Sequence, residues 1–477
     1  MSSIDKIQFD TKVQYIKFRV LSEVARCAYE GTLLENINEI PKIISPGPDS
    51  QMRCCIYKER AIVSERINRA ISGVKLNQNV ISVINIACDE CPSEGYEVTD
   101  DCRGCLAHRC SRACPKNAIS FSEDQKARID KTKCINCGLC ASSCPYSAIR
   151  NRKRPCTNAC KVNAITMDED MSAKIIDEKC ISCGQCVYQC PFGAITDRSS
   201  IVQIIEALKN KDNHVYAILA PSFASQFDGF KLGQIITGIK ELGFYQVLEA
   251  ALGADMVTYS ETHELLEKGF LTSSCCPAFV RFIKKYYPEV AEKVSHNPSP
   301  MIALSKFLKS QDDKAKVVFI GPCTAKKREA VEDEENNTDY VMTFEELMAV
   351  LVGKDIDLDS LEETELDNAS YFGRIFGRIG GLSESVVEML KEENIDFEVK
   401  PILCEGFDNI KKALNKVKKG NMDFNFLEGM ACMGGCIGGP CNINHEIKDK
   451  FDLDKFGKTS KVDSINDSLN RIKKEVI

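Results

Sequence analysis

Residues 134–145 read CINCGLCASSCP, and residues 180–191 read CISCGQCVYQCP. Both stretches space four cysteines as C-x2-C-x2-C-x3-C and follow the last cysteine with proline. In this spacing, three close thiolates hold one four-iron, four-sulfur cubane, while the fourth cysteine binds the neighbouring cubane. The two runs therefore predict ferredoxin-like units in which cubanes lie in pairs.

A repeat extends this pattern through residues 102–195. Four of its segments end with a cysteine that is followed four and five residues later by Ala-Ile: Cys114, Cys144, Cys160 and Cys190. The stretches 119–133 and 165–179 place strand-forming residues around a polar, acidic turn, which predicts a hairpin in each. We therefore expect two tandem ferredoxin-like units.

Pairing the runs assigns sixteen cysteines to four cubanes. The four predicted sets are Cys102, Cys105, Cys110 and Cys144; Cys114, Cys134, Cys137 and Cys140; Cys160, Cys180, Cys183 and Cys186; and Cys88, Cys91, Cys156 and Cys190. The last set rests on counting, so two alternatives stay open. Either Cys88 and Cys91 are buried thiols and only three accessory cubanes exist, or Cys88, Cys91, Cys102 and Cys105 bind zinc.

The composition agrees with iron–sulfur chemistry in a reducing compartment. The chain has 26 cysteines and only 5 histidines among 477 residues, which favours all-thiolate clusters over mixed zinc sites. The first residues, MSSIDKIQFDTK, contain no apolar signal segment, so we expect a cytoplasmic location, where disulfides are rare. We expect no membrane span, because no run of 18 apolar residues occurs, and no nucleic-acid binding at a net charge of −7.

Cysteine density divides the chain into three regions. Residues 1–85 are helical by periodicity and have no evident role, and residues 86–198 form the predicted cluster domain. Residues 199–477 have an α/β pattern, with buried strands in HVYAILAPS (214–222) and KVVFIGPC (316–323). Strands that end at polar or ligating residues are the usual way in which an α/β domain builds a site.

Three motifs in the last region carry further cysteines. They read TSSCCPAF at 272–279, GPCTAKK at 321–327 and EGMACMGGCIGGPC at 428–441. Together they offer four or more thiolates from distant loops, with glycines that let the backbone approach a cofactor closely.

These motifs, in this order, resemble the signature loops of iron-only (FeFe) hydrogenase, and those of a clostridial-type subgroup in particular. The resemblance covers residues from about 200 to the end and implies the α/β catalytic domain of that family. Ferredoxin-like α+β units and a helical N-terminal region would precede this domain. It implies a monomeric enzyme of anaerobic metabolism that interconverts H2 with two protons and two electrons. It further implies ferredoxin or flavodoxin as electron carrier, and hydrogenase maturation proteins as partners.

The resemblance also implies a cofactor, the H-cluster. This is a 4Fe-4S cubane bridged to a diiron unit that carries carbonyl, cyanide and a dithiolate bridge. Its implied cubane ligands are Cys276, Cys323, Cys432 and Cys436, and Cys436 also bridges to the diiron unit. The other implied contacts are Lys326, Ala220, Pro221 and Ser222 at the cyanides, and Met430 and Phe376 as packing around the two irons.

A proton route is implied by the same resemblance. Cys275 matches a thiol that exchanges protons with the cofactor, and the expected order is Cys275, a water, Glu264, Ser295, Glu261 and bulk solvent. Glutamates three residues apart share one helix face. The simpler alternatives are an inert buried thiol at Cys275 and an exposed charged helix face at the glutamates.

Other functions stay open on the sequence. A sensory relative would bind H2 without rapid turnover, and an iron–sulfur assembly factor of the same fold would lack the chemistry altogether. The basic run at 150–154 is either a solvated loop or a surface that steers an acidic ferredoxin.

Overall fold

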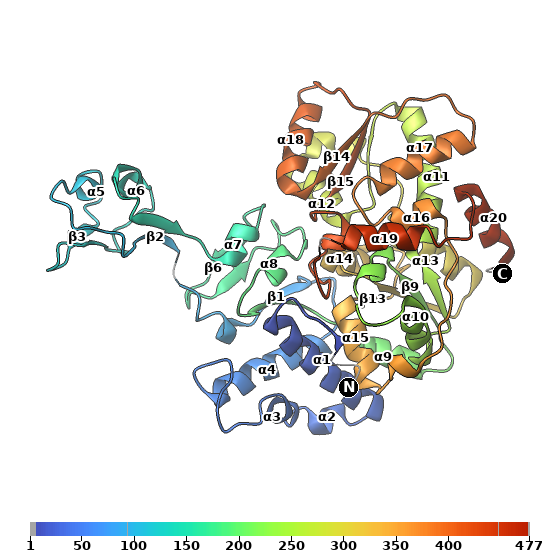
Figure 1. Ribbon diagram of the computed structural model, residues 1–477, viewed down its shortest axis with the longest axis horizontal. Helices are drawn as coiled ribbons and strands as arrows, with labels where there is room; N and C mark the ends of the chain where they lie inside the picture. The colour runs from blue at the N-terminus through green and yellow to red at the C-terminus, as the bar shows by residue number, and fades with distance from the viewer. Residues whose placement is uncertain (1–5, 93, 447, 476–477) are drawn as a thin grey trace.

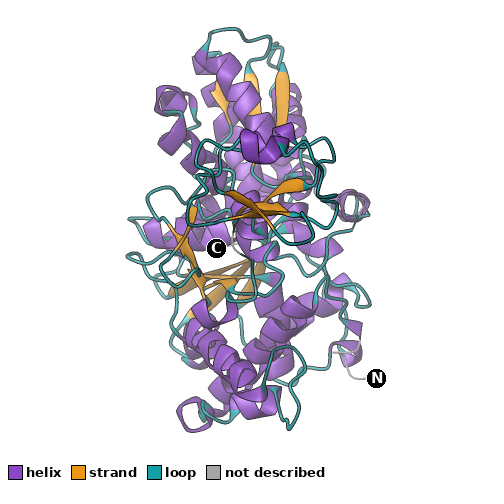
Figure 2. Cartoon of the chain, turned by 90° about the vertical axis from the view of Figure 1, so that its left-hand side faces the viewer, coloured by secondary structure: helices purple, strands orange, loops and turns teal. Residues whose placement is uncertain are grey.

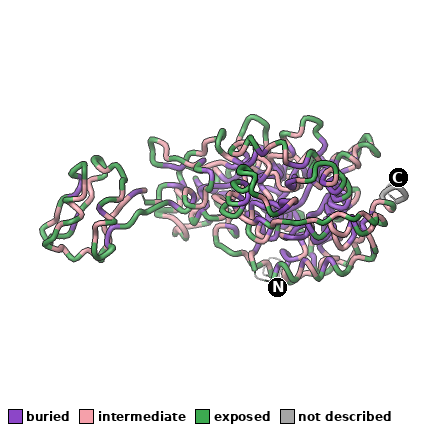
Figure 3. The backbone as a smooth tube through the Cα atoms, turned by 90° about the horizontal axis from the view of Figure 1, so that it is seen from above, coloured by how far each residue is buried: buried purple, intermediate pink, exposed green. Residues whose placement is uncertain are grey.

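The computed structural model of the chain describes residues 6–92, 94–446 and 448–475. An arm of ferredoxin type projects from a larger body of helices and parallel strands (Figure 1). Most of the arm is exposed or half-buried, whereas buried backbone concentrates in the body (Figure 3). The predicted class is confirmed: an α/β domain follows ferredoxin-like units and a helical N-terminal region. None of the described helices is long and apolar enough to cross a membrane.

The N-terminal helices pack directly on the body. They are α1 (Lys12–Glu30), α2 (Leu33–Asn36), α3 (Ile40–Ile44) and α4 (Ile56–Ile71). Helix α1 begins where Thr11 and Gln14 form a reciprocal capping box, and it ends at Gly31 with φ of 75°. It lies against α15 (Phe344–Gly353) so closely that a Cβ on Gly353 would stand 2.7 Å from the Cβ of Ala25. This region therefore shares the main hydrophobic core.

The two ferredoxin-like units are nested rather than sequential. The outer unit contains β1 (Ile81–Val83), α7 (Pro155–Ala159), β6 (Ile165–Met167), β7 (Ala173–Ile175), α8 (Gln185–Tyr188) and β8 (Ile195–Asp197). The inner unit contains β2 (Gly95–Val98), α5 (Arg109–Arg112), β3 (Ile119–Phe121), β4 (Ala127–Ile129), α6 (Leu139–Ser143) and β5 (Ile149–Arg152). Both predicted hairpins form, as β3–β4 and β6–β7. Because β1 pairs with β8, the outer unit begins before residue 86, and the inner unit is inserted between Cys91 and Cys156.

Two parallel sheets organise the body and appear as separate groups of strands in Figure 2. The first has the order β10-β9-β12-β13, with β9 (His214–Leu219), β10 (Gln246–Glu249), β12 (Ala315–Ile320) and β13 (Tyr340–Met342). The second has the order β11-β15-β14, with β11 (Leu271–Thr272), β14 (Pro401–Glu405) and β15 (Phe426–Met430). The remaining body helices are α9 (Ile201–Lys209), α10 (Leu232–Glu241), α11 (Ala250–Lys268), α12 (Pro277–Tyr286), α13 (Pro300–Gln311), α14 (Thr324–Glu332), α16 (Tyr371–Ile375), α17 (Gly381–Glu392), α18 (Gly406–Lys418), α19 (Asp449–Gly457) and α20 (Ile465–Glu475).

The carboxyl ends of four strands deliver the sequence motifs to one place. Strand β9 runs into Ala220-Pro221-Ser222, and β12 runs into Gly321-Pro322-Cys323. In the second sheet, β11 leads to the Cys275-Cys276 pair and β15 leads to Cys432. Parallel pairing puts these ends at the same edge of each sheet, which is where open α/β sheets place their ligand sites.

Candidate active site

A cavity of about 100 Å³ lies where these strand ends meet. Eleven predicted residues line it together: Ala220, Pro221, Ser222, Cys275, Cys276, Cys323, Lys326, Phe376, Met430, Cys432 and Cys436. Lys326 is the only charged side chain among the lining residues. The space is several times what one water molecule needs, which is about 10–15 Å³ on this measure.

Four of these thiols, of Cys276, Cys323, Cys432 and Cys436, are close electrostatic neighbours. Burial, and then the thiols of Cys276 and Cys436, raise the pKa of Cys323 to about 12. Burial and the thiol of Cys276 likewise raise the pKa of Cys436 to about 11. The electrostatic neighbours of the Cys432 thiol include Cys323, Cys276 and Cys436. Four such groups become thiolates together only when a cationic centre offsets their repulsion, so the set fits a metal cluster.

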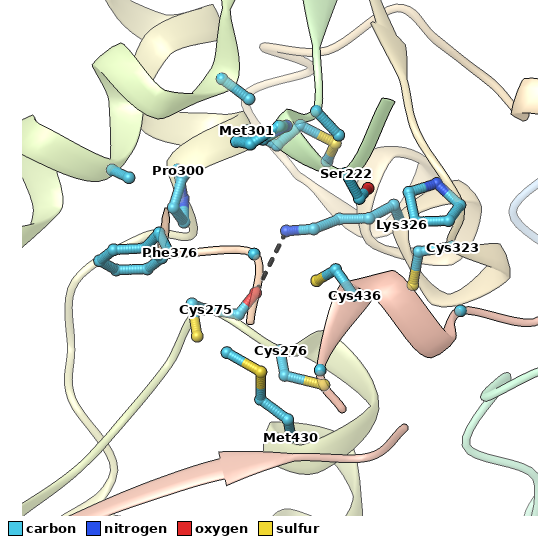
Figure 4. Close-up of a pocket in the computed structure, with 18 of the residues that line it drawn as sticks. Ser222, Cys275, Cys276, Pro300, Met301, Cys323, Lys326, Phe376, Met430 and Cys436 are labelled. Carbon is cyan, nitrogen blue, oxygen red and sulfur yellow. Dashed lines mark hydrogen bonds between the residues drawn. The ribbon is translucent and has the colours of Figure 1, made fainter. Parts of the chain in front are cut away.

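Lys326 enters this cavity from α14. Its ammonium donates a hydrogen bond to the carbonyl of Cys275 at 3.4 Å (Figure 4) and lies 6.0 Å from the centre of the Phe319 ring. It also donates to the Glu329 carboxylate at 2.8 Å. Glu329 was not predicted from the sequence, although its position three residues after Lys326 on a helix is a recognisable pairing signal.

Two further features of the cavity wall bear on what it can hold. The Ser222 hydroxyl is buried and has no hydrogen-bond partner among the described residues, although Ser222 lines the cavity. Gly435 has φ of 93°, and a Cβ there would stand 2.7 Å from the Met430 sulfur. Buried polar groups without partners are costly, so this hydroxyl fits a bound group that accepts a hydrogen bond.

Glu261 lies at the inner end of the predicted proton route. It is fully buried on α11, and its Oε1 accepts hydrogen bonds from the backbone and hydroxyl of Ser274 at 3.1 and 2.9 Å. Burial raises the pKa of Glu261 to about 7. Burial, and then the Glu261 carboxylate, raise the pKa of the neighbouring Cys275 thiol well above its ordinary value.

Glu264 lies at the outer end, so the order expected from the sequence is reversed. Its carboxylate accepts from Ser295 at 2.8 Å and pairs with Lys268 at 2.6 Å and with the largely exposed His296 at 3.0 Å. Although burial opposes it, hydrogen bonds from Lys268 and Ser295 lower the pKa of Glu264. The Ser295 hydroxyl also lowers the pKa of Glu261, which places this serine between the two carboxylates.

Each of the four predicted cysteine sets in the arm is brought together. Within the sets, the pKa of one thiol is raised by burial first and then by its partners: Cys110 by Cys144 and Cys105, Cys140 by Cys134 and Cys114, and Cys186 by Cys183, Cys180 and Cys160. In the fourth set, burial followed by Cys190, Cys88 and Cys91 raises the pKa of Cys156 to about 12. The fold thus gathers the set that counting alone had suggested.

The zinc alternative is not supported by this geometry. Cys102 packs with the inner unit, whereas Cys88 packs with the outer unit. The two pairs of the zinc alternative therefore belong to different cores.

The outer unit contacts the cavity loops directly. Thr324 donates a hydrogen bond to the carbonyl of Ser182 at 2.8 Å, and a Cβ on Gly184 would meet Thr324 Oγ1 at 2.5 Å. Cys183 is among the electrostatic neighbours of Cys432. Since Gly184 has φ of 75°, glycine is required both by the turn and by the contact.

Comparison with known proteins relates the region around this cavity to one protein family. Residues 213–440 match the family described as iron only hydrogenase large subunit, C-terminal domain. This segment is similar to the C-terminal domain of iron-only hydrogenases and makes up just under half of the chain. Residues 101–148 match a 4Fe-4S dicluster domain, and residues 173–196 match a 4Fe-4S binding domain. The chain is therefore an iron–sulfur protein distantly related to FeFe-hydrogenases.

Three relatives show the range of similarity to this domain. Iron hydrogenase 1 of Clostridium pasteurianum is 29% identical over 402 residues, which cover 72% of this chain and 70% of that protein. Protein NAR1 of Arabidopsis thaliana is 23% identical over 51% of this chain and 68% of that protein. A solved structure of an FeFe-hydrogenase from Chlamydomonas reinhardtii is 19% identical, with a TM-score of 0.48, over 57% of this chain and 93% of that chain.

Proposed function

We propose that this chain is an iron-only hydrogenase that interconverts H2 with two protons and two electrons. The observation that carries the proposal is one cavity at which four thiols, a buried lysine and a relay of proton-carrying side chains meet. The similarity to iron hydrogenase 1 of Clostridium pasteurianum supports the same conclusion.

The proposed cofactor is the H-cluster. Cys276, Cys323, Cys432 and Cys436 would hold its cubane, and Cys436 would be shared with the diiron unit. When bound, this group supplies the iron at which H2 is formed or cleaved. Lys326 and Ser222 would donate hydrogen bonds to its cyanides, which offsets the cost of burying their negative charge. Met430 and Phe376 would exclude water. Hydrogenase maturation proteins would deliver the diiron unit.

The proposed proton path runs from Cys275 through Glu261, Ser295 and Glu264 to His296 at the surface. Cys275 holds a proton at its sulfur, because burial disfavours the thiolate. Glu261 both accepts and releases a proton near neutral pH, since burial raises its pKa to about 7. Glu264 is held in place by Lys268 and Ser295 and connects the path to solvent.

The proposed electron path runs through four accessory cubanes in the arm. The cubane of the set containing Cys183 would be the accessory cluster next to the cavity, because this thiol is an electrostatic neighbour of Cys432. Each cubane transfers one electron at a time. The two electrons of the reaction would pass to or from a ferredoxin or flavodoxin.

Two other functions make different use of the same fold. A sensory protein would keep the cavity and lose turnover, and an iron–sulfur assembly factor would lack the diiron unit. The series of titratable side chains from Cys275 to His296 favours turnover, because a cluster carrier needs no proton path. The buried Lys326 favours an anionic ligand at the cavity.

Infrared spectroscopy and H2 assays test these functions together. The chain is produced with the diiron cofactor supplied, and spectra are recorded beside H2 evolution from a reduced dye. Cyanide and carbonyl bands with H2 evolution are expected. Bands without turnover would favour the sensor, and the absence of bands would contradict both the enzyme and the sensor.

A further inference from the structure

The arginines of the basic run at 150–154, which the sequence suggested as a surface for steering a partner, have partners within the arm. Arg150 pairs with Asp101 at 3.1 Å, and Arg152 pairs with Glu97 at 2.5 Å across the β2–β5 ladder. Arg154 is 2% exposed and donates to the backbone carbonyls of Pro92 and Met171. Arg154 therefore joins the two units, and the pairs of Arg150 and Arg152 reduce the charge that this run offers to a partner.

A different set of basic side chains in the inner unit is free. Residues 95–153 hold eleven Lys and Arg and six Asp and Glu, a net charge of +5, in a chain whose net charge is −7. Two bound cubanes, each about −2 with its thiolates, would leave this unit near +1, with the negative charge beneath the surface. Arg103, Arg109 and Arg112 are exposed and have no ion-pair partner within the described part of the chain.

These arginines adjoin one cysteine set, and an apolar residue stands among them. Arg103 follows Cys102, Arg109 precedes Cys110, and Arg112 lies on the same short helix, α5. The loop between Cys105 and Cys110 is two residues longer than in the other runs, and its Leu106 is 93% exposed. In Figure 1, α5 lies at the end of the arm that is farthest from the body.

The loop between Cys105 and Cys110, which carries the exposed Leu106, is fixed by a contact of His108 within the inner unit. His108 adopts the left-handed conformation, with φ of 44°, and its ring stacks on Phe121 with 3.8 Å between ring centres. The anchored loop therefore presents Leu106 without support from another part of the chain. An exposed large apolar side chain with exposed arginines three residues to either side in the sequence has the character of an interface core with a polar rim.

We propose that Arg103, Leu106, Arg109 and Arg112 form the docking surface for a small acidic carrier protein that exchanges single electrons with the cubane of Cys102, Cys105, Cys110 and Cys144. This proposal rests on the proposed function and specifies its partner site. One electron passes from the reduced cubane to the oxidised carrier, or in the reverse direction, and no bond is made or broken. Arginine is suited to this task because its fork pairs with carboxylates in a fixed geometry.

Charge reversal tests the docking surface in the holoenzyme. The probe is a purified two-cluster ferredoxin of low isoelectric point, and methyl viologen serves as the dye. In the triple variant Arg103→Glu, Arg109→Glu and Arg112→Glu, the KM for ferredoxin should rise at least tenfold while the dye-linked rate stays within twofold. The triple Arg→Lys variant should keep the KM within threefold, and added salt should weaken the wild type more than the triple Glu variant.

A matched reversal on the body controls for net charge. Lys314, Lys412 and Lys419 are exposed, and their change to glutamate should leave the KM for ferredoxin within twofold. Binding of ferredoxin is also measured directly by calorimetry, so that the docking surface is tested without turnover. A triple Arg→Glu variant with full iron content and unchanged ferredoxin affinity would overturn the docking surface. Absent dye-linked H2 evolution in the wild type would instead overturn the proposed function.

Discussion

Glu261 is tied to Ser274, the residue before Cys275, by two hydrogen bonds to one carboxylate oxygen, from the backbone at 3.1 Å and from the hydroxyl at 2.9 Å. Its second oxygen, Oε2, has no hydrogen-bond partner among the described residues. The carboxyl group is therefore fixed beside the cavity while one oxygen stays available. This geometry suits a group that takes a proton from a neighbouring thiol and passes it on.

The first prediction concerns the Cys275 thiol. Cys275→Ala should keep the cyanide and carbonyl infrared bands and lose about 100-fold or more of the H2 evolution rate, because one proton-transfer group is removed and no metal ligand is changed. Cys404→Ala is the matched control, since Cys404 is a buried thiol outside the cavity. Retained activity in Cys275→Ala would show that the proton leaves by another route.

The second prediction uses the raised pKa of Glu261, about 7 against an ordinary value of 4.5. Between these values the folded protein keeps a proton that the unfolded chain has released. The free energy of unfolding therefore falls as the pH rises from 4.5 to 7. Glu261→Gln removes this dependence, so the variant should lose activity and gain stability relative to the wild type at pH 8. Urea unfolding at pH 5 and pH 8 measures the effect, and an equal change at both values would contradict it.

The third prediction is an iron count. Five cubanes and one diiron unit amount to about 22 irons per chain. The double variant Cys88→Ala and Cys91→Ala should hold about 18, because the fourth accessory cubane is lost. Changing the exposed Cys54 and Cys55 to alanine should leave the content unchanged. A wild-type content of about 18 irons would mean that Cys88, Cys91, Cys156 and Cys190 hold no cubane.

The fourth prediction concerns a buried ion network beneath the cavity. The fully buried Lys327 ammonium donates to Asp197 and Glu346, each at 2.7 Å. Lys17 of α1 pairs with Asp197 and Glu345, each at 2.6 Å. Although burial lowers it, Asp197 and Glu346 raise the pKa of Lys327, so this lysine stays charged.

Removing Lys327 should therefore be costly. Lys327→Met leaves the buried Glu346 without its lysine partner and Asp197 with Lys17 alone, which costs about 3–5 kcal/mol. The midpoint of urea unfolding, followed by circular dichroism, measures this loss. Lys412→Met on the exposed face of α18 should change the midpoint little. Equal stability of the two variants would show that the network contributes nothing.

The cysteine sets show how much local sequence specifies. Ligand spacing in a ferredoxin run is a property of a few consecutive residues, so the sets could be paired without tertiary information. The nesting of the two units could not, because β1 and β8 are more than a hundred residues apart in sequence and meet only in the fold.

The proton route shows the opposite case. A spacing of three places Glu261 and Glu264 on one face of α11, but periodicity does not say which end of that face meets the cavity. Packing of α11 decides this by burying Glu261 beside Ser274 and leaving Glu264 near Lys268 and His296. The basic run at 150–154 was similarly undecided until the fold paired Arg150 with Asp101 and Arg152 with Glu97.

The sequence by itself determined the α/β pattern, the cavity-lining motifs and the cysteine sets that we propose as cluster ligands, because each depends on residues close together in the chain. Only the tertiary structure decided the order of the relay, the place of the N-terminal helices and the arginines that remain free. These depend on burial and on partners brought from distant segments, such as Lys17 meeting Asp197, and no local pattern encodes such a meeting.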